Sequence, residues 1–93
     1  MATLDVSHDQ AALRFVAYLD GVQVGFADYE SVPGALLITH TEVDPPYGGR
    51  GVGSALAEAA LDYIRESGLQ VVPQCSFARY WIGKHPLYAD LVA

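Results

Sequence analysis

The chain has 93 residues, of which 52% are hydrophobic and 17% are charged, and its formal net charge is −6. We expect one domain over residues 1–93, because this length suits a single small core. The acidic balance argues against non-specific binding to nucleic acid or to an anionic membrane surface, since both need basic patches. No apolar run approaches the about 20 residues of a membrane span, and residues 1–10 lack the charged and apolar regions of a signal peptide. With Cys75 as its only cysteine, the chain is expected in the reducing cytoplasm.

The first half of the chain predicts an antiparallel meander. Apolar and polar residues alternate in three of its segments, which is typical of half-buried strands. Asp20-Gly21 predicts a two-residue hairpin turn, since both central positions of a type I′ turn need a positive φ angle, and Pro33-Gly34 predicts another turn. Strands are therefore expected at residues 3–7, 12–19, 22–30 and 35–43.

After residue 50 the apolar spacing changes from that of strands to that of a helix. Val52, Leu56, Ala60 and Ile64 recur at helical intervals, so a helix is predicted over residues 50–67. Gly68 then stands where a helix C-terminus favours glycine.

The short apolar run at residues 69–73 predicts a further strand. A strand–helix–strand crossover makes this strand parallel to the one at 35–43. Ser76 is the expected N-cap of a second helix that ends near Lys84, and the last seven residues suggest one more helical turn. These elements define an α+β fold with a sheet of four or five strands.

Residues 44–54, "DPPYGGRGVGS", place four glycines and an arginine between a strand and the long helix. Free N–H groups at a helix N-terminus attract anions, and glycines let the backbone approach a phosphate closely. Arg50 could add a charged, two-pronged contact, so a diphosphate is the ligand that this chemistry predicts. The alternative is a glycine-rich turn with an exposed arginine. The segment matches neither the Walker pattern nor the dinucleotide fingerprint.

The segment from Glu42 to Leu69 resembles the acetyl-CoA loop and helix of the GCN5-related N-acetyltransferases. Two later positions of that family's motif, Gln/Arg-x-x-Gly-x-Gly/Ala, fall on Gly51 and Gly53. Its first position falls on Gly48, which departs from the pattern. The C-terminal part resembles a very small subfamily of about 90 to 110 residues, through Pro-x-Cys-Ser and His-Pro-x-Tyr segments at Pro73, Cys75, Ser76, His85, Pro86 and Tyr88.

The resemblance implies a minimal version of that fold, with acetyl-CoA between a splayed pair of strands at 35–43 and 69–73. It implies pantetheine contacts near Thr41 and Val43, transfer of the acetyl group to an amine acceptor, and an open acceptor site. Arg79 is a further candidate for the coenzyme phosphates. The pyrophosphate would lie on the backbone of Gly48, Gly49, Arg50, Gly51, Val52, Gly53 and Ser54.

Cys75 and His40 are the candidate catalytic pair. Cys75 precedes a predicted helix, where the helix dipole favours a thiolate nucleophile, and the alternative is a small buried hydrophobe. Strand alternation places His40 on one face with Leu36 and Ile38, where it could act as a base near neutral pH or remain a structural histidine. In the subfamily that this chain resembles, a histidine here is a proposed partner of the cysteine. Glu42 is a second possible base or an ordinary strand-end carboxylate.

Three scattered histidines and one cysteine lack the spacing of a metal site, so no metal is expected. We expect a monomer or weak dimer. The main functional alternative is a module that binds coenzyme A without transferring an acyl group, and a further one is an interaction domain whose glycine loop is only a turn.

Overall fold

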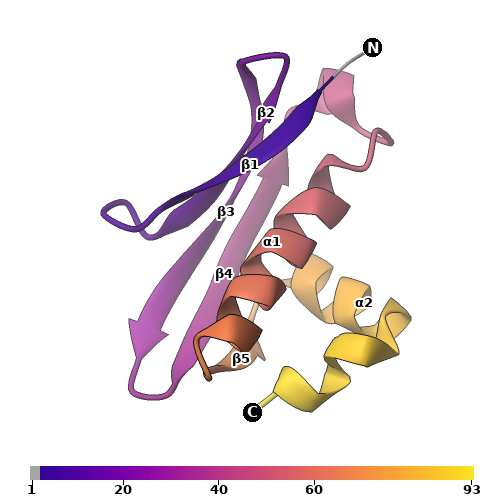
Figure 1. Cartoon of the computed structure of the whole chain (residues 1–93). Helices are drawn as coiled ribbons and strands as arrows, with labels where there is room; N and C mark the ends of the chain where they lie inside the picture. Colours follow the sequence, from indigo (N-terminus) through magenta and orange to yellow (C-terminus); the bar gives the residue numbers. More distant parts are fainter. Residues whose placement is uncertain (1–2) are drawn as a thin grey trace.

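A computed structural model describes residues 3–93 and shows one five-stranded sheet in the order β1-β2-β3-β4-β5. The first four strands are antiparallel neighbours, and β5 is parallel to β4. The predicted α+β class, the meander and the parallel last strand are therefore confirmed (Figure 1). The elements are β1 (Leu4–Asp9), β2 (Arg14–Leu19), β3 (Val22–Val32), β4 (Ala35–Val43), the 3₁₀ helix η1 (Pro45–Tyr47), α1 (Val52–Glu66), β5 (Gln70–Pro73), α2 (Ser76–Lys84) and the 3₁₀ helix η2 (Pro86–Leu91).

Local sequence signals account for the turns. Asp20 and Gly21 have φ angles of 49° and 83°, as the hairpin prediction requires. At the end of α1, the Gly68 N–H bonds the Arg65 carbonyl and the Leu69 N–H bonds the Ile64 carbonyl, at 3.2 and 3.0 Å. This Schellman arrangement satisfies carbonyls that the helix leaves free, and it confirms the terminating glycine.

Two helix starts differ from the predictions. Helix α1 begins at Val52 rather than residue 50, because Gly51 has a φ of 79° and cannot be helical. The N-cap of α2 is Cys75 rather than Ser76, which is the first helical residue. The Cys75 backbone is extended and its sulfur accepts the Ala78 N–H at 3.3 Å, so the thiol occupies the place that a serine hydroxyl was expected to take.

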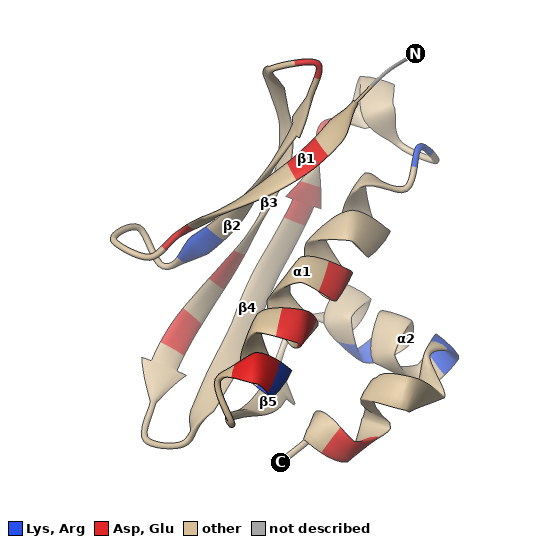
Figure 2. Cartoon of the chain, in the orientation of Figure 1, with Lys and Arg blue, Asp and Glu red and all other residues tan. Residues whose placement is uncertain are grey.

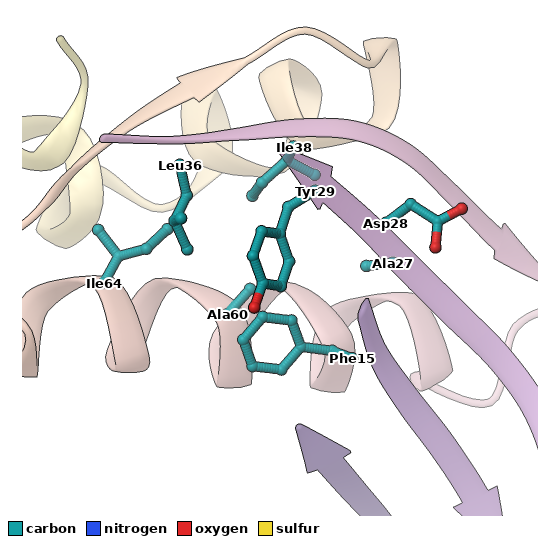
Figure 3. A pocket seen from close by; sticks show the side chains of 8 residues that line it. All are labelled: Phe15, Ala27, Asp28, Tyr29, Leu36, Ile38, Ala60 and Ile64. Carbon is teal, nitrogen blue, oxygen red and sulfur yellow. The ribbon is translucent and has the colours of Figure 1, made fainter. Parts of the chain in front are cut away.

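The core lies between one face of the sheet and the two helices. Its fully buried side chains contribute on the order of 1.5–3 kcal/mol each. Figure 3 shows a crevice within this layer, between β2, β3, β4 and α1. All but one of the residues around it belong to the core; the exception is Asp28. The largest fully buried residues are Leu56, Leu61, Ile64, Val24, Val52 and Val71.

The opposite face of the sheet carries side chains that lie outside the core cluster. Directly opposed residues of neighbouring strands point to the same side. The pairing therefore groups side chains into rows across the strands. We call this surface the open face; its rows are Asp5 and Tyr18, then Ser7, Val16, Phe26 and Glu42, then Asp9, Arg14, Asp28 and His40, and finally Glu30, Leu37 and Val72.

Candidate functional site

Strand β4 is paired differently along its two halves. Its pairing with β5 runs from Ala35–Gln70 to Ile38–Pro73 and stops there, although β4 continues to Val43. The N–H groups of Gln74 and Cys75 both donate to the Ile38 carbonyl, at 3.0 and 3.1 Å, and the chain then enters α2. Within residues 3–93, no strand pairs with this side of β4 beyond Ile38. We call residues 35–38 the paired half of β4 and residues 39–43 its open half.

A bulge separates these halves. Tyr29 of β3 opposes Ile38, whereas the preceding residue, Asp28, opposes His40, so Thr39 is an extra residue in β4. An extra residue reverses which face the following side chains occupy. The prediction that His40 shares a face with Leu36 and Ile38 is therefore wrong: those two residues belong to the core, whereas His40 lies on the open face.

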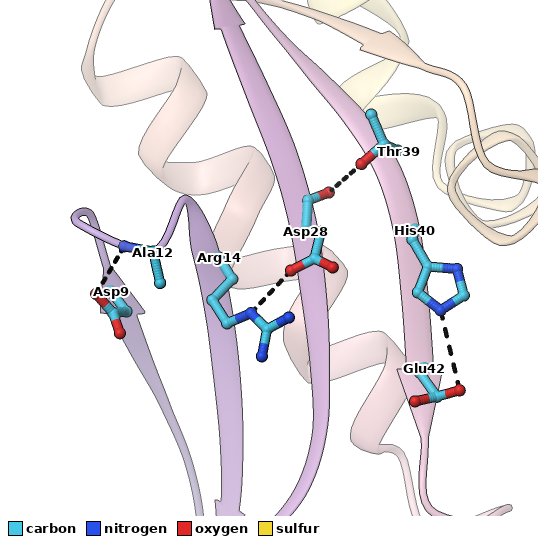
Figure 4. A network of polar contacts seen from close by, with 7 residues as sticks. All are labelled: Asp9, Ala12, Arg14, Asp28, Thr39, His40 and Glu42. Carbon is cyan, nitrogen blue, oxygen red and sulfur yellow. Dashed lines mark hydrogen bonds and ion pairs between the residues drawn. The ribbon is translucent and has the colours of Figure 1, made fainter.

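His40 and Glu42 stand together on the open face, as Figure 4 shows. Their nearest charged atoms, His40 Nε2 and Glu42 Oε1, are 3.9 Å apart, and both side chains are more than half exposed. The Phe26 ring centre lies 5.8 Å from that of His40. Neither side chain is enclosed, so both are accessible from the solvent.

The thiol of Cys75 contacts the opposite side of β4. Its sulfur lies 3.6 Å from the Thr41 hydroxyl oxygen, and Thr41 follows His40 in the strand, where it points to the other face. The thiol is half-buried and also accepts the Ala78 N–H at the start of α2. The structure thus joins Cys75 to Thr41 and gives no contact between Cys75 and His40. Their joint role in catalysis stays a prediction.

The glycine loop leads from the open half of β4 to the start of α1. Gly49 and Gly51 both have φ angles of 79°, a region that favours glycine strongly. The N-cap, Gly51, has no side chain to accept from the first helical N–H groups, and the first turn contains no acidic residue. Uncapped N–H groups at a helix start form an anion-binding site. Arg50 is exposed at this point, with its guanidinium carbon 5.7 Å from the centre of the Tyr47 ring.

Three predicted coenzyme residues also have structural contacts. A Cβ atom on Gly53 would come within 2.8 Å of the Phe77 ring, so this glycine allows α1 and α2 to approach closely. The Ser54 hydroxyl accepts the indole N–H of Trp81 at 3.0 Å. The Arg79 guanidinium donates to the carbonyls of residues 73 and 74, which holds the turn after β5.

Sequence reasoning missed one residue that positions this region. Gly25 opposes Val43 in the sheet. A Cβ atom on Gly25 would lie 2.7 Å from the Glu42 carbonyl oxygen and 3.1 Å from a Val52 methyl carbon. The absent side chain therefore lets the end of β4 and the start of α1 pack against β3. The available signal was a lone glycine inside the alternating strand.

Residues 3–93 contain no group of three His, Cys, Asp or Glu side chains arranged to hold a metal ion. Over the same residues, no helix combines the length and hydrophobicity needed to cross a bilayer.

Comparisons with known proteins show the family and agree with the fold. Residues 14–91 match the family model of the GCN5-related N-acetyl-transferases. Protein NATD1 from Gallus gallus is 33% identical over 86 residues, which cover 90% of this chain and 78% of the relative. A GCN5-like protein from Staphylococcus aureus, solved by NMR, superposes with a TM-score of 0.76 and 27% identity, over 100% of this chain and 91% of that one.

A crystal structure of the aminoglycoside N-acetyltransferase AAC(6')-Iy in complex with CoA has a TM-score of 0.55 and 23% identity, over 81% of this chain and 57% of that one. At this identity the likeness shows a common fold. With the family model spanning most of its length, the chain belongs to the GCN5-related N-acetyltransferase family.

Proposed function

We propose that this protein transfers an acetyl group from acetyl-CoA to an amine, with the coenzyme along the open half of β4 and at the N-terminus of α1. The observation that carries the proposal is the adjacency of these two features. A strand edge that no strand of residues 3–93 pairs with is followed by a glycine loop that leads to a helix start without a side-chain cap. One supplies hydrogen-bonding groups for amides, and the other supplies N–H donors for a diphosphate.

The residues present suit the diphosphate. The N–H groups at Val52, Gly53 and Ser54 have no side-chain cap within the described chain. Gly51 leaves open space where a Cβ would stand, since no atom lies within 4 Å of that position. Arg50 adds the positive charge, and the missing long side chain at Gly48 makes the backbone donors and Arg50 the main contacts.

The pantetheine part would lie along the strand edge between Thr41 and Val43. Because the pantetheine would reach this edge from the glycine loop, the open face would stay free for the acceptor amine. His40 and Glu42 point to that face, and Cys75 lies on the other side of β4. An amine that enters from the open face therefore meets His40 and Glu42 before it meets the thiol.

Acetyl-CoA supplies a thioester whose carbonyl carbon is already activated for transfer. In the direct route, the amine nitrogen forms the new C–N bond while the thioester C–S bond breaks. His40 Nε2 or Glu42 receives the amine proton, directly or through water. In the relay route, the Cys75 sulfur bonds the acetyl carbon while the C–S bond to the coenzyme breaks, and the thiol proton passes to the coenzyme sulfur. The amine nitrogen then forms the C–N bond while the bond to Cys75 breaks, and the amine proton returns to the Cys75 sulfur, directly or through water. Both routes release the coenzyme as a free thiol.

The alternative function, binding of coenzyme A without transfer, is favoured by one observation. The two predicted catalytic residues occupy opposite faces of β4, so no preformed Cys–His pair exists. A protein that used the fold only to hold the coenzyme would need neither residue.

Calorimetry with coenzyme A, followed by acetyl-CoA turnover across a panel of amines, tests the proposal. We expect binding, and release of free thiol that depends on the amine. Binding without turnover would leave the coenzyme-binding alternative, and the absence of binding would refute both functions.

Two variants then separate the routes. In the relay route, intact-mass spectra after incubation with acetyl-CoA show an acetylated wild type and an unmodified Cys75→Ala variant. If Cys75→Ala keeps its full rate and His40→Ala loses it, the direct route holds with His40 as the base. An unchanged rate in His40→Ala removes the histidine from the mechanism.

A further inference from the structure

The charges of this protein are divided unequally between its two parts. Residues 1–43 contain six acidic residues and one basic residue, whereas residues 44–93 contain five acidic and four basic residues. In Figure 2 the basic residues of the second part are coloured along the loop and the helices, while the meander carries mainly acidic positions. The sheet strands therefore carry most of the net negative charge.

Five carboxylates of the meander share the open face with one cation. That cation, Arg14, is already bound: its Nε donates to Asp28 at 2.8 Å, and its guanidinium lies 4.2 Å from the centre of the Phe26 ring. The open face thus keeps an excess of four negative charges at neutral pH. The carboxylates are Asp5, Asp9, Asp28, Glu30 and Glu42.

Apolar side chains lie among these carboxylates. Val16 is only 6% exposed although it stands outside the core cluster, and Phe26 beside it is half-buried. Leu37 and Val72 continue the apolar surface toward β5. A sheet face of this kind suits a partner that brings methylene groups together with positive charge, as lysine and arginine side chains do.

We infer that the open face docks a basic polypeptide segment and presents its lysine to the open half of β4. The inference rests on the proposed function and narrows its acceptor to one class. Charge complementarity selects a cationic partner and opposes a second copy of this chain, which would bring carboxylates against carboxylates. Small ligands favour concave pockets, and the crevice of Figure 3 lies on the helix side of the sheet, so a surface spread over several strands suits an extended chain.

The position of the carboxylates also explains how the lysine would be placed. Glu42 and His40 belong to the open half of β4, whereas Asp5 lies on β1 and Glu30 opposes Leu37 in the paired half. Flanking cations of the segment would contact the distant carboxylates, and the acceptor lysine would occupy the space beside His40. Attraction of this type raises the rate of encounter more than the rate of chemistry.

Two blocked peptides test the inference. Each contains one lysine as its only amine, flanked by arginines in one peptide and by serines in the other. We expect kcat/KM to be about tenfold higher for the arginine peptide at low salt and the difference to shrink as salt is added. Labelled peptides measured by fluorescence anisotropy against the protein with coenzyme A give the same comparison for binding.

A matched pair of double variants locates the effect. Asp5→Asn with Glu30→Gln removes two charges from the open face, and Glu58→Gln with Glu66→Gln removes two from exposed positions on α1. The arginine preference should fall to about threefold in the first variant and stay unchanged in the second. The serine peptide, which does not use these carboxylates, should react equally in both.

Three results would overturn the inference. Equal kcat/KM and equal binding for the two peptides would show that the open face does not select charge. Equal loss in both double variants would show an effect of net charge alone. Spermidine as a better acceptor than the arginine peptide, with the same sensitivity to Asp5→Asn and Glu30→Gln, would replace the polypeptide by a small polyamine. Failure of the proposed function differs from all three, because neither peptide would then be acetylated, whether or not coenzyme A binds.

Discussion

The two halves of β4 belong to one continuous strand but differ in sequence and in environment: residues 35–38 are all apolar, whereas residues 39–43 are mostly polar. The paired half, residues 35–38, has strands on both sides and contributes Leu36 and Ile38 to the core. The open half, residues 39–43, has β3 on one side and no strand on the other within the described chain. One strand thus contributes to the core over its first half and leaves a free edge over its second, and the bulge at Thr39 separates the two. The proposed function places the coenzyme at the second half.

The largest expected effect compares two glycines in the left-handed conformation, Gly34 directly before β4 and Gly51 at the end of the loop that follows it. Gly34 and Gly51 both have φ angles of 79° and open space around the Cβ position. Gly51→Val should weaken coenzyme A binding by about 100-fold, because a β-branched residue strains this conformation by about 1–3 kcal/mol or moves the loop. Calorimetry measures the affinity.

The control is Gly34→Val, which imposes the same strain at the turn before the paired half. It should lower the melting temperature and leave the affinity for coenzyme A within about twofold. Equal affinity in Gly51→Val and wild type would reduce the glycine loop to a turn.

Gly25 supports the open half from the side of β3. Gly25→Ala should lower the free energy of unfolding by about 1–3 kcal/mol, because the new methyl group meets the backbone at Glu42 and the side chain of Val52. It should also weaken coenzyme binding, since both neighbours border the site. Chemical denaturation measures the first effect and calorimetry the second.

Gly83→Ala serves as the matched substitution, because nothing lies within 4 Å of the position of its Cβ in helix α2. This variant should gain about 0.5–1 kcal/mol of stability from helix propensity. If Gly25→Ala were as stable as wild type, the close approach at the end of β4 would not constrain the site.

Arg50 carries the exposed charge of the loop. Arg50→Ala should weaken coenzyme A binding by about tenfold, which corresponds to the loss of a charge-assisted contact of about 1.4 kcal/mol. Lys84→Ala removes one exposed cation from the end of α2 and should leave the affinity unchanged. A similar loss in both variants would indicate general electrostatic attraction in place of a contact at the loop.

The smallest expected effect is on the pH dependence of stability, through His8 of β1 and its contacts with β2 and β3. His8 lies stacked 4.1 Å from the Phe15 ring, and its Nε2 is 2.6 Å from the Tyr29 hydroxyl oxygen. Burial lowers the pKa of His8 below 6.5, although the nearby Asp9 carboxylate opposes this shift. The folded protein therefore binds this proton less readily than the unfolded chain does.

The lowered pKa of His8 makes the protein less stable as the pH falls. His8 in its neutral form makes its full contribution to the free energy of unfolding above pH 6.5. This contribution is lost as the pH falls from 6.5 through the lower pKa of the folded state. Chemical denaturation of wild type and His8→Phe at several pH values should show that the variant loses less free energy of unfolding in acid. Its affinity for coenzyme A should be unchanged. An equal loss of stability in acid for wild type and His8→Phe would contradict this role of His8.

Sequence patterns predicted most of the fold because hydrophobic periodicity and turn residues act locally. Asp20-Gly21 and Gly68 adopt the conformations that their residue types favour. The side of the sheet on which His40 lies could not be predicted in this way. It depends on the bulge at Thr39, which no residue type marks and which only the pairing of β3 with β4 defines.

As with the fold, the local features of the candidate site could be predicted from the sequence and its tertiary contacts could not. The glycine loop was located from its residues alone, since few other segments need so many residues without a Cβ. The contact between Cys75 and Thr41 joins residues 34 positions apart and depends on where β5 leaves β4. Likewise, the roles of Gly53 and Ser54 in packing α1 against α2 arise from tertiary contacts with Phe77 and Trp81.

The most direct test of the central claim is a titration of ¹⁵N-labelled protein with coenzyme A, followed by the NMR shifts of the backbone amides. If the coenzyme lies where we propose, the amides of residues 39–43 and 51–54 should show large shifts. Small shifts are expected for residues 35–38 and 70–73, which are already paired with each other. Shifts concentrated in those paired residues, or a titration that moves no amide in the open half of β4, would contradict this placement.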